Sequence, residues 1–250
     1  MADNNPIDIS GLTLESKLVK RGLYGGAMTI SIPAEWRDVS DVRQVPDHQE
    51  VYQDCTFANN SEGGNKSSNN NASTTNHSLQ GTGGCLVVEI LERQDDVSDD
   101  DATSFFFNDL ANANESETAD SSNRSLAYTN IWTVGKAEVA SSSSDEKYDN
   151  EENLIPNLSA RVKACSCIGN QTIGTLRNKD ELEEGKASEV IVEMCVIRLE
   201  AVQTDLLISL SMPIFSKKVG KKDEGSRKEH SALYLSILKS FEVLDWSLFC

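Results

Sequence analysis

Glu189-Val-Ile-Val-Glu-Met-Cys-Val-Ile-Arg-Leu199 and Thr204-Asp-Leu-Leu-Ile-Ser-Leu-Ser-Met-Pro213 are the two stretches that decide the fold. The first is long, apolar and rich in β-branched residues, and the second alternates between apolar and polar side chains. Both patterns are typical of strands with a buried face. Only about four residues separate the two stretches, so they are predicted to pair as an antiparallel hairpin.

Further strands are predicted on the N-terminal side of this hairpin. Met28, Ile30 and Ile32 follow the period of two that marks a half-buried strand within residues 23–33. A short strand follows at 50–57, and a nearly continuous apolar strand at 85–91. Residues 126–139 and 158–176 are expected to contribute the remaining strands.

Two segments have the character of helices. Residues 95–113 begin with acids, which suit a helix N-terminus, and contain Phe106 and Leu110 at a spacing of four. Residues 231–243 carry apolar side chains at helical spacing, with Ser231 as the expected N-cap. The apolar end of the chain, residues 244–250, is expected to dock onto the domain. Together these elements predict an α+β layer fold.

Four tracts are too polar to contribute to a core. They lie at residues 56–82, 112–124, 141–153 and 216–227. The Asn/Ser-rich tract at 56–82 is predicted to be a disordered insertion between two strands, because it buries too little to offset the entropy of ordering. About 180 residues remain without the tracts, which is a normal size for a single domain.

The charge of the chain limits the classes of partner. The 250 residues carry a net charge of −17, so a nucleic-acid binder, which needs a basic face, is not expected. The acidic surface favours a basic protein partner, although maintaining solubility is an equally good explanation for most of the acids. The sequence holds no apolar stretch long enough to span a membrane, and Met1–Pro6 has no features of a secretory signal. A cytosolic protein, with access to the nucleus left open, is therefore expected.

Nothing in the sequence predicts a metal site, a cofactor or a catalytic centre. The six cysteines, at positions 55, 85, 165, 167, 195 and 250, have no zinc-site spacing and are interpreted as reduced thiols. The acidic run at 95–101 does not fit a calcium loop, because Asp100 and Phe106 occupy the positions that require Gly and Glu. The glycine pair Gly25-Gly26 begins a strand and predicts a tight turn or bulge, not a nucleotide-binding loop.

The segment Asp38-Val-Ser-Asp-Val-Arg-Gln-Val-Pro-Asp-His-Gln-Glu-Val-Tyr52 has the features of a rigid acidic loop. Pro46 fixes its own backbone and favours an extended residue before it, and Pro-Asp favours a turn. Asp47 and Glu50 are thereby placed at the rim of the sheet, where two carboxylates are suited to bind Lys or Arg of a partner. Asp47 serving only to cap the turn is the alternative.

Several segments resemble the Ran guanine nucleotide release factor family, or Mog family. The resemblance begins with Leu23-Tyr-Gly-Gly-Ala27, Asp38-Val-Ser-Asp-Val-Arg43 and Val45-Pro-Asp-His-Gln-Glu-Val51. It continues through Val87-Val-Glu-Ile-Leu-Glu92 and residues 196–213 to the final Val243-Leu-Asp-Trp-Ser-Leu-Phe249. It therefore covers nearly the whole chain.

The resemblance implies a Mog/PsbP-like α/β/α sandwich, with a central, mainly antiparallel sheet of about six strands and helices on both faces. It implies one domain at residues 21–250 after a flexible tail at 1–20. It also implies a non-enzymatic, monomeric protein of nucleus and cytoplasm that binds the GTPase Ran, promotes release of its nucleotide and supports nuclear protein import. The Ran-binding residues implied are Asp47 and Glu50, accompanied by Arg43, Pro46 and Gln49.

Two departures from the family pattern and two alternative functions accompany this resemblance. The insertion at 56–82 directly follows the loop, where it is in a position to modulate access, and Ser211 replaces a frequent Asn.

An adaptor in the trafficking of a membrane protein is the main alternative, since some family members have that role. A PsbP-like photosystem protein shares the fold but needs a targeting segment that residues 1–21 do not supply.

Overall fold

The computed structural model describes residues 17–54, 83–113, 124–135, 153–173, 188–213 and 230–249. The predicted insertion at 56–82 lies outside these ranges, as does most of each of the other polar tracts. The described elements, in chain order, are β1 (Leu18–Leu23), η2 (Tyr24–Gly26), β2 (Met28–Pro33), β3 (Trp36–Asp38), η3 (Val39–Asp41), β4 (Gln49–Asp54), β5 (Cys85–Glu92), α1 (Asp99–Ala113), β6 (Arg124–Val134), β7 (Val162–Ile173), β8 (Ser188–Leu199), η6 (Glu200–Val202), β9 (Thr204–Pro213), α2 (Ala232–Ser240), β10 (Glu242–Val243) and η7 (Trp246–Phe249).

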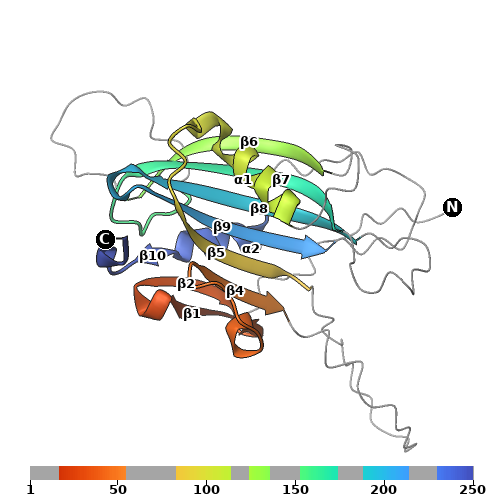
Figure 1. Cartoon of the computed structure of the whole chain (residues 1–250). Helices are drawn as coiled ribbons and strands as arrows, with labels where there is room; N and C mark the ends of the chain where they lie inside the picture. Colours follow the sequence, from red (N-terminus) through yellow and green to blue (C-terminus); the bar gives the residue numbers. More distant parts are fainter. Residues whose placement is uncertain are drawn as a thin grey trace, which may run out of the picture.

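A large antiparallel sheet forms the centre of the molecule (Figure 1). Its seven described strands have the order β3-β4-β5-β9-β8-β7-β6, and all neighbouring pairs are antiparallel. The predicted hairpin of β8 and β9 is confirmed, with Leu199 opposite Thr204 and a left-handed Gln203 in the turn. The mainly antiparallel character is also confirmed, but the sheet exceeds the expected six strands. The three-residue β3 is too short to show a sequence period.

A second, three-stranded sheet with the order β1-β2-β10 was not predicted. The strand expected at 23–33 is confirmed for Met28–Pro33, whereas residues 24–26 form the turn η2, which joins β2 to the unpredicted antiparallel strand β1. β1 begins at Leu18, so the end of the stretch predicted to be a flexible tail is strand. The two-residue β10 joins the other edge of β2, opposite Met28 and Thr29.

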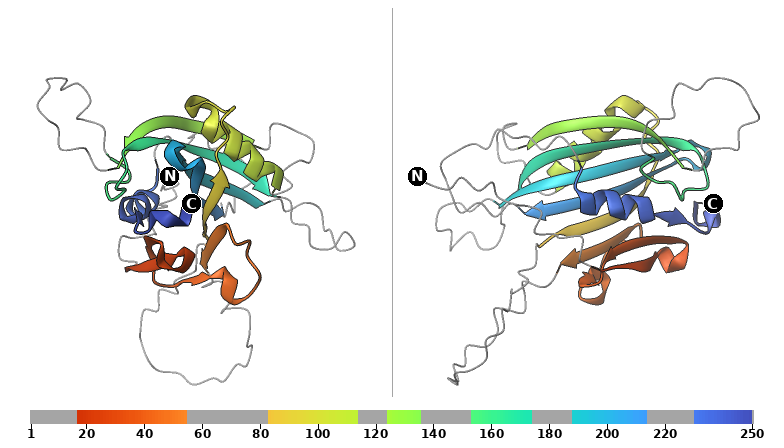
Figure 2. Two further views of the ribbon diagram at one scale, coloured as in Figure 1. Left: turned by 60° about the vertical axis from the view of Figure 1, so that its left-hand side comes forward. Right: turned by 180° about the vertical axis from the view of Figure 1, so that it is seen from behind.

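The two faces of the large sheet have different coverings. On one face, Met194 and Val196 of β8 pack with Phe106 and Phe107 of α1. Neighbouring residues of β8, which point to the opposite face, join a cluster that contains α2 and strand β2. Figure 1 shows α1 in front of the sheet, and the rear view in Figure 2 shows α2 in front of it. The second face is thus covered by a small sheet together with α2, instead of the helical layer expected of an α/β/α sandwich.

The C-terminal elements follow the sequence prediction closely. Ser231 caps α2, because its hydroxyl accepts a hydrogen bond from the Tyr234 amide at 3.1 Å. The Leu244 and Asp245 amides donate to the Ala27 carbonyl at 2.8 and 3.0 Å, and the aromatic and aliphatic side chains of η7 pack against the core. The expected docking of the chain end is therefore confirmed for the described residues through Phe249. Neither α1 nor α2, the two α-helices described, has the length and apolar character to cross a membrane.

Candidate functional site

The acidic loop lies between β3 and β4 and is fixed at both ends. At its start, the Asp38 carboxylate accepts a hydrogen bond from the Ser40 amide at 2.8 Å and caps η3. At its end, the Gln49 amide donates to the Pro46 carbonyl at 2.9 Å and closes a turn. The His48 carbonyl then accepts a hydrogen bond from the Ile90 amide of β5 at 2.9 Å. The loop therefore ends in a defined turn at the edge of the large sheet, as its sequence predicts.

Asp47 lies at the tip of this turn with its side chain in solvent. The residue is exposed, and it makes no hydrogen bond or ion pair with any described residue. The alternative in which Asp47 only caps the turn has no support, because a backbone hydrogen bond closes the turn. Its carboxylate is left available to a partner.

Glu50, the other predicted acid, is engaged within the protein. It is half-buried, and its Oε1 accepts a hydrogen bond from the Tyr24 amide at 2.6 Å. Burial raises the pKa of Glu50, and the nearby charge of Asp38 raises it further, while the hydrogen bond from Tyr24 opposes both effects. Glu50 therefore joins the loop to the small sheet, a role that the sequence did not predict.

The other predicted contact residues are distributed over the loop and the start of β4. Arg43 and Pro46 are exposed. Gln49 is half-buried and donates from Nε2 to Oε1 of Glu89 at 2.8 Å. The same oxygen of Glu89 lies 3.4 Å from Nε2 of His48. Sequence reasoning missed Glu89, although antiparallel pairing of β4 with β5 places it directly opposite Gln49.

Acidic charge gathers around this loop. The pKa of Tyr52 is raised to about 12, first by burial and then by Asp38 and Glu50, with a smaller contribution from Asp41 and an opposing one from Arg21. The Val42 side chain stands in the same loop and is 83% exposed. The loop thus offers carboxylates together with the exposed apolar side chains of Val42 and Pro46, an arrangement suited to binding a basic protein surface.

Tyr24 is the second residue that sequence reasoning missed. Its hydroxyl shares its one proton between the carbonyls of His48 and Val88, at 2.9 and 2.8 Å, while its amide donates to the Glu50 carboxylate. The expected tight turn at Gly25-Gly26 is confirmed, and all three residues of η2 have positive φ angles of 50°, 67° and 96°. The sequence signal was the tyrosine beside a glycine pair, but its contact with β4 and β5 required the fold.

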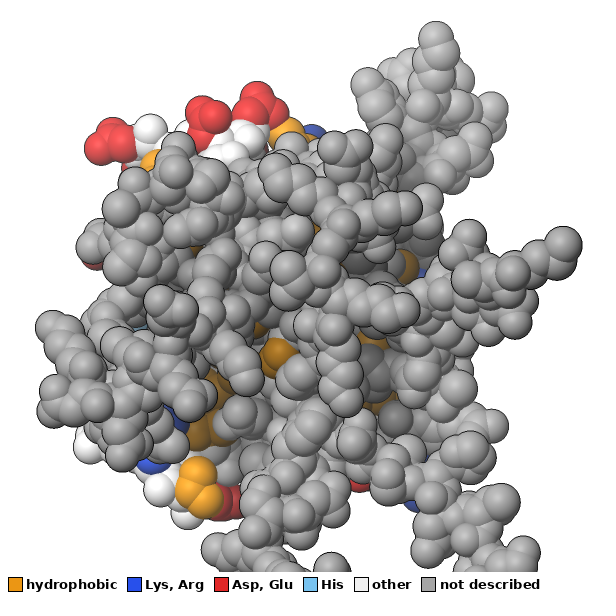
Figure 3. Space-filling model, turned by 90° about the vertical axis from the view of Figure 1, so that its right-hand side faces the viewer, with side chains coloured by type: hydrophobic (Ala, Val, Ile, Leu, Met, Phe, Trp, Pro, Cys, Tyr) orange, Lys and Arg blue, Asp and Glu red, His pale blue; other side chains and the backbone are white. Residues whose placement is uncertain are grey.

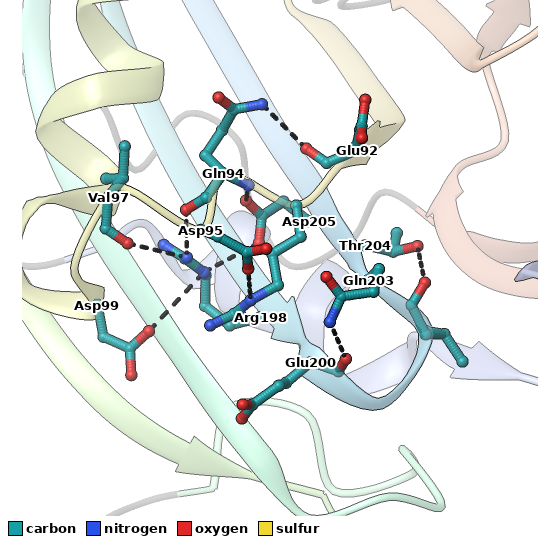
Figure 4. A network of polar contacts seen from close by, with 12 residues as sticks. Glu92, Gln94, Asp95, Val97, Asp99, Arg198, Glu200, Gln203, Thr204 and Asp205 are labelled. Carbon is teal, nitrogen blue, oxygen red and sulfur yellow. Dashed lines mark hydrogen bonds and ion pairs between the residues drawn. The ribbon is translucent and has the colours of Figure 1, made fainter.

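A buried polar cluster lies close by, at the end of β5 (Figure 4). Arg198 donates from Nη2 to the carbonyls of Gln94 and Val97, both at 3.0 Å, and the Asp205 carboxylate accepts a hydrogen bond from the Gln94 amide at 3.0 Å. Asp205 lies opposite Leu91 in the sheet, so the cluster fixes the path of the chain from β5 to α1. Its hydrogen bonds to the backbone indicate a structural role.

A second acidic region lies away from the loop. The first turn of α1 contains Asp99, Asp100 and Asp101. Figure 3 shows acidic side chains at the top of the molecule, the side on which α1 lies in Figure 1. Among the described residues, no group of three or more His, Cys, Asp or Glu side chains is arranged to hold a metal ion. Asp100 and Asp101 are exposed and are interpreted as a solvated helix start, whereas the half-buried Asp99 lies 3.7 Å from Nε of Arg198.

Known proteins that are similar to this chain in sequence or in fold carry names that refer to Ran. The chain is 26% identical over 241 residues to the "Probable ran guanine nucleotide release factor" of Dictyostelium discoideum, covering 92% of this chain and 95% of the relative. It is 24% identical over 234 residues to the "Ran guanine nucleotide release factor" of Danio rerio, covering 92% and 100%. Among solved structures, the Ran-binding protein Mog1p of Saccharomyces cerevisiae is similar in fold, with a TM-score of 0.56, 22% identity and coverage of 94% and 100%.

A family model supports the same assignment. The model, described as "Ran-interacting Mog1 protein", matches residues 21–213. This range extends from β1 to the end of β9 and contains the acidic loop together with Tyr24, Glu89 and the Arg198–Asp205 pair. The match covers well over half of the 250 residues, so the chain belongs to the Ran-interacting Mog1 family.

Proposed function

We propose that this protein binds the GTPase Ran through the loop at residues 38–50 and promotes release of the bound guanine nucleotide. One observation carries the assignment to this loop: the carboxylate of Asp47 is exposed, on a turn held by backbone hydrogen bonds, beside the half-buried Glu50. Membership of the Ran-interacting family and the names of the relatives support Ran as the partner. Arg43, Pro46 and Gln49 complete the proposed contact surface.

The mechanism follows from thermodynamic linkage. A protein that binds nucleotide-free Ran more tightly than nucleotide-bound Ran must weaken nucleotide binding by the same factor. Weakening by about a thousandfold requires a coupling free energy of about 4 kcal/mol. Hydrogen bonds to charged groups contribute about 1.5–3 kcal/mol each, so two carboxylates that bind basic groups of nucleotide-free Ran supply the required order of magnitude.

Asp47 and Glu50 are suited to different parts of this process. The exposed Asp47 is placed to attract a basic surface during association, because its field reaches solvent unobstructed. The half-buried Glu50 is placed to form a shorter-range contact once water has been displaced. The protein would then act stoichiometrically, with no bond made or broken, and would support nuclear import from both nucleus and cytoplasm.

A release assay tests this function. Ran is loaded with a fluorescent guanine nucleotide, and the rate of fluorescence loss is measured with and without the protein. Wild type is expected to accelerate release, and the double variant Asp47→Asn with Glu50→Gln to lose most of the acceleration. Asp109→Asn, which removes an exposed acid of α1, is the matched control and should behave like wild type.

Two outcomes would contradict the proposal in different ways. If wild type has no effect on release and does not bind Ran, the function is wrong. If the double variant accelerates release as well as the control does, Ran binding is correct but the loop is not the contact surface.

A further inference from the structure

Tyr24 connects the two sheets at the candidate site. The residue belongs to the turn between β1 and β2 of the small sheet, whereas its partners Glu50 and Val88 lie on β4 and β5 of the large sheet and its partner His48 directly precedes β4. Its amide binds the Glu50 side chain at 2.6 Å, and its hydroxyl lies 2.9 Å from the His48 carbonyl and 2.8 Å from the Val88 carbonyl. A single residue thus contacts the end of the acidic loop, the start of strand β4 and the neighbouring strand β5.

These contacts act on both proposed Ran-binding acids. His48 directly follows Asp47, so holding the His48 carbonyl limits movement of the turn that carries the Asp47 side chain. The amide of Tyr24 meanwhile fixes one carboxylate oxygen of Glu50. The relative positions of the two carboxylates therefore depend on one tyrosine from a different sheet.

The backbone of Tyr24 shows that the position is strongly determined. Its φ of 50° lies in the left-handed region, which residues other than glycine rarely adopt. Such a conformation persists where surrounding contacts hold it, and it occurs preferentially at functional sites. Burial, followed by the charges of Glu50 and Glu89, raises the pKa of Tyr24, so the hydroxyl remains a donor throughout the physiological range.

We infer that Tyr24 is a positioning residue for Ran binding, which sets the geometry of Asp47 and Glu50 without contacting the partner through its hydroxyl. This inference rests on the proposed function. Correctly placed carboxylates form stronger short-range contacts with Ran. Tyr24 is therefore expected to lengthen the lifetime of the complex. Charge steering, which governs encounter, is unchanged when the hydroxyl is removed.

The test compares Tyr24→Phe with Tyr52→Phe by surface plasmon resonance against immobilised nucleotide-free Ran. Tyr52→Phe is the matched control, since Tyr52 lies on β4 and its hydroxyl forms no hydrogen bond with a described residue. Loss of a hydrogen bond predicts that Tyr24→Phe raises the dissociation rate roughly threefold to tenfold, with an unchanged association rate. The effect should shrink in an Asp47→Asn background, because the tyrosine acts through that loop. Equal dissociation rates for the two Phe variants, or an undiminished effect in the Asp47→Asn background, would overturn the inference.

Amide hydrogen exchange separates this inference from the proposed function. The amides of Gln49 and Ile90, which bind the carbonyls of Pro46 and His48, should exchange faster in Tyr24→Phe than in Tyr52→Phe. If wild type fails to bind Ran, the proposed function falls, and the exchange rates still decide whether Tyr24 holds the loop. Unchanged exchange at both amides would overturn the positioning role in either case.

Discussion

Arg198 and Asp205 form an ion pair across the β8–β9 hairpin, with Nε and Oδ1 2.9 Å apart and side chains that are 1% and 0% exposed. The strand register places the two residues directly opposite each other. Arg198 then binds two carbonyls of the β5–α1 connection, and Asp205 accepts from an amide of the same connection. The central hairpin therefore anchors the β5–α1 connection through three hydrogen bonds to its backbone, beside the packing of Val97 against the core.

Breaking this pair should destabilise the whole domain. Asp205→Ala leaves the buried Arg198 with only the more distant, 40% exposed Asp99 carboxylate at 3.7 Å, and removing one partner of a buried ion pair typically costs about 3–5 kcal/mol. The free energy of unfolding, measured by urea denaturation, should fall by this amount. Asp95→Asn is the control, because Asp95 is 66% exposed in its pair with Arg93 and should contribute at most about 1 kcal/mol. A similar, small loss in both variants would show that the buried pair is not an anchor.

Removing the charge of Asp47 should slow association with Ran. The side chain is exposed and has no partner among the described residues, so Asp47→Asn changes the surface potential without disturbing a hydrogen bond. The association rate measured by stopped flow should fall about two- to fivefold at low salt, and the difference should vanish as salt screens the charge. An equal reduction for Asp109→Asn would indicate an effect of net charge alone.

Glu50→Gln should have opposite effects on stability and on function: the variant should gain stability relative to wild type as the pH rises, but it should release nucleotide from Ran more slowly. The pKa of Glu50 is raised above 4.5 in the folded protein, so the folded state holds this proton more tightly than the unfolded state does. The protonated Glu50 therefore stabilises the folded state at a pH below the unfolded-state pKa of 4.5. This stabilisation is lost as the pH rises through the higher pKa that Glu50 has in the folded protein. Glutamine retains an acceptor for the Tyr24 amide without this pH dependence.

As the pH rises from about 4 to about 7, the melting temperature of Glu50→Gln should therefore increase relative to that of wild type. Nucleotide release by the variant should be slower, because the charge is missing. A variant that loses stability relative to wild type over the same pH range would contradict the assigned direction of the pKa shift.

Three thiols are buried in the part of the chain that the structure describes, and they should be inert in the native protein. Burial raises the pKa of Cys165 and of Cys167 to about 12 and raises that of Cys195 as well. Less than about one thiol in a thousand is then ionised at mildly alkaline pH. Mass spectrometry after iodoacetamide treatment should find these cysteines alkylated only in denaturant, with the half-buried Cys85 as the internal reference. Rapid native alkylation of Cys195 would show that the core opens locally.

The central part of the fold was predictable because its residues follow simple periods. The β8–β9 hairpin, the Ser231 cap and the turn at Gly25-Gly26 each depend on neighbours close in sequence. β3 and β10 were not predictable, since strands of three and two residues form only when a partner strand supplies the hydrogen bonds.

In the candidate site, too, features set by neighbouring residues could be predicted, and contacts between distant residues could not. The rigid turn around Asp47 could be predicted from Pro46 and its neighbours. The partners of Glu50 and Gln49 could not, because Tyr24 and Glu89 are distant in sequence and approach the loop only through the two sheets. The assignment of these residues to Ran binding remains a prediction.

The hydrogen bond between the Asp54 amide and the Gly84 carbonyl, at 2.9 Å, has a consequence for how the chain tolerates changes in length. β4 ends at Asp54 and β5 begins at Cys85, so the two described ends of the β4–β5 connection lie next to each other. They lie at the end of β4 away from Gln49, roughly 17 Å along the strand from the acidic loop. The β4–β5 connection is therefore a natural graft point, where a short hairpin turn or a reporter domain can replace residues 55–82 while the register of the sheet is preserved.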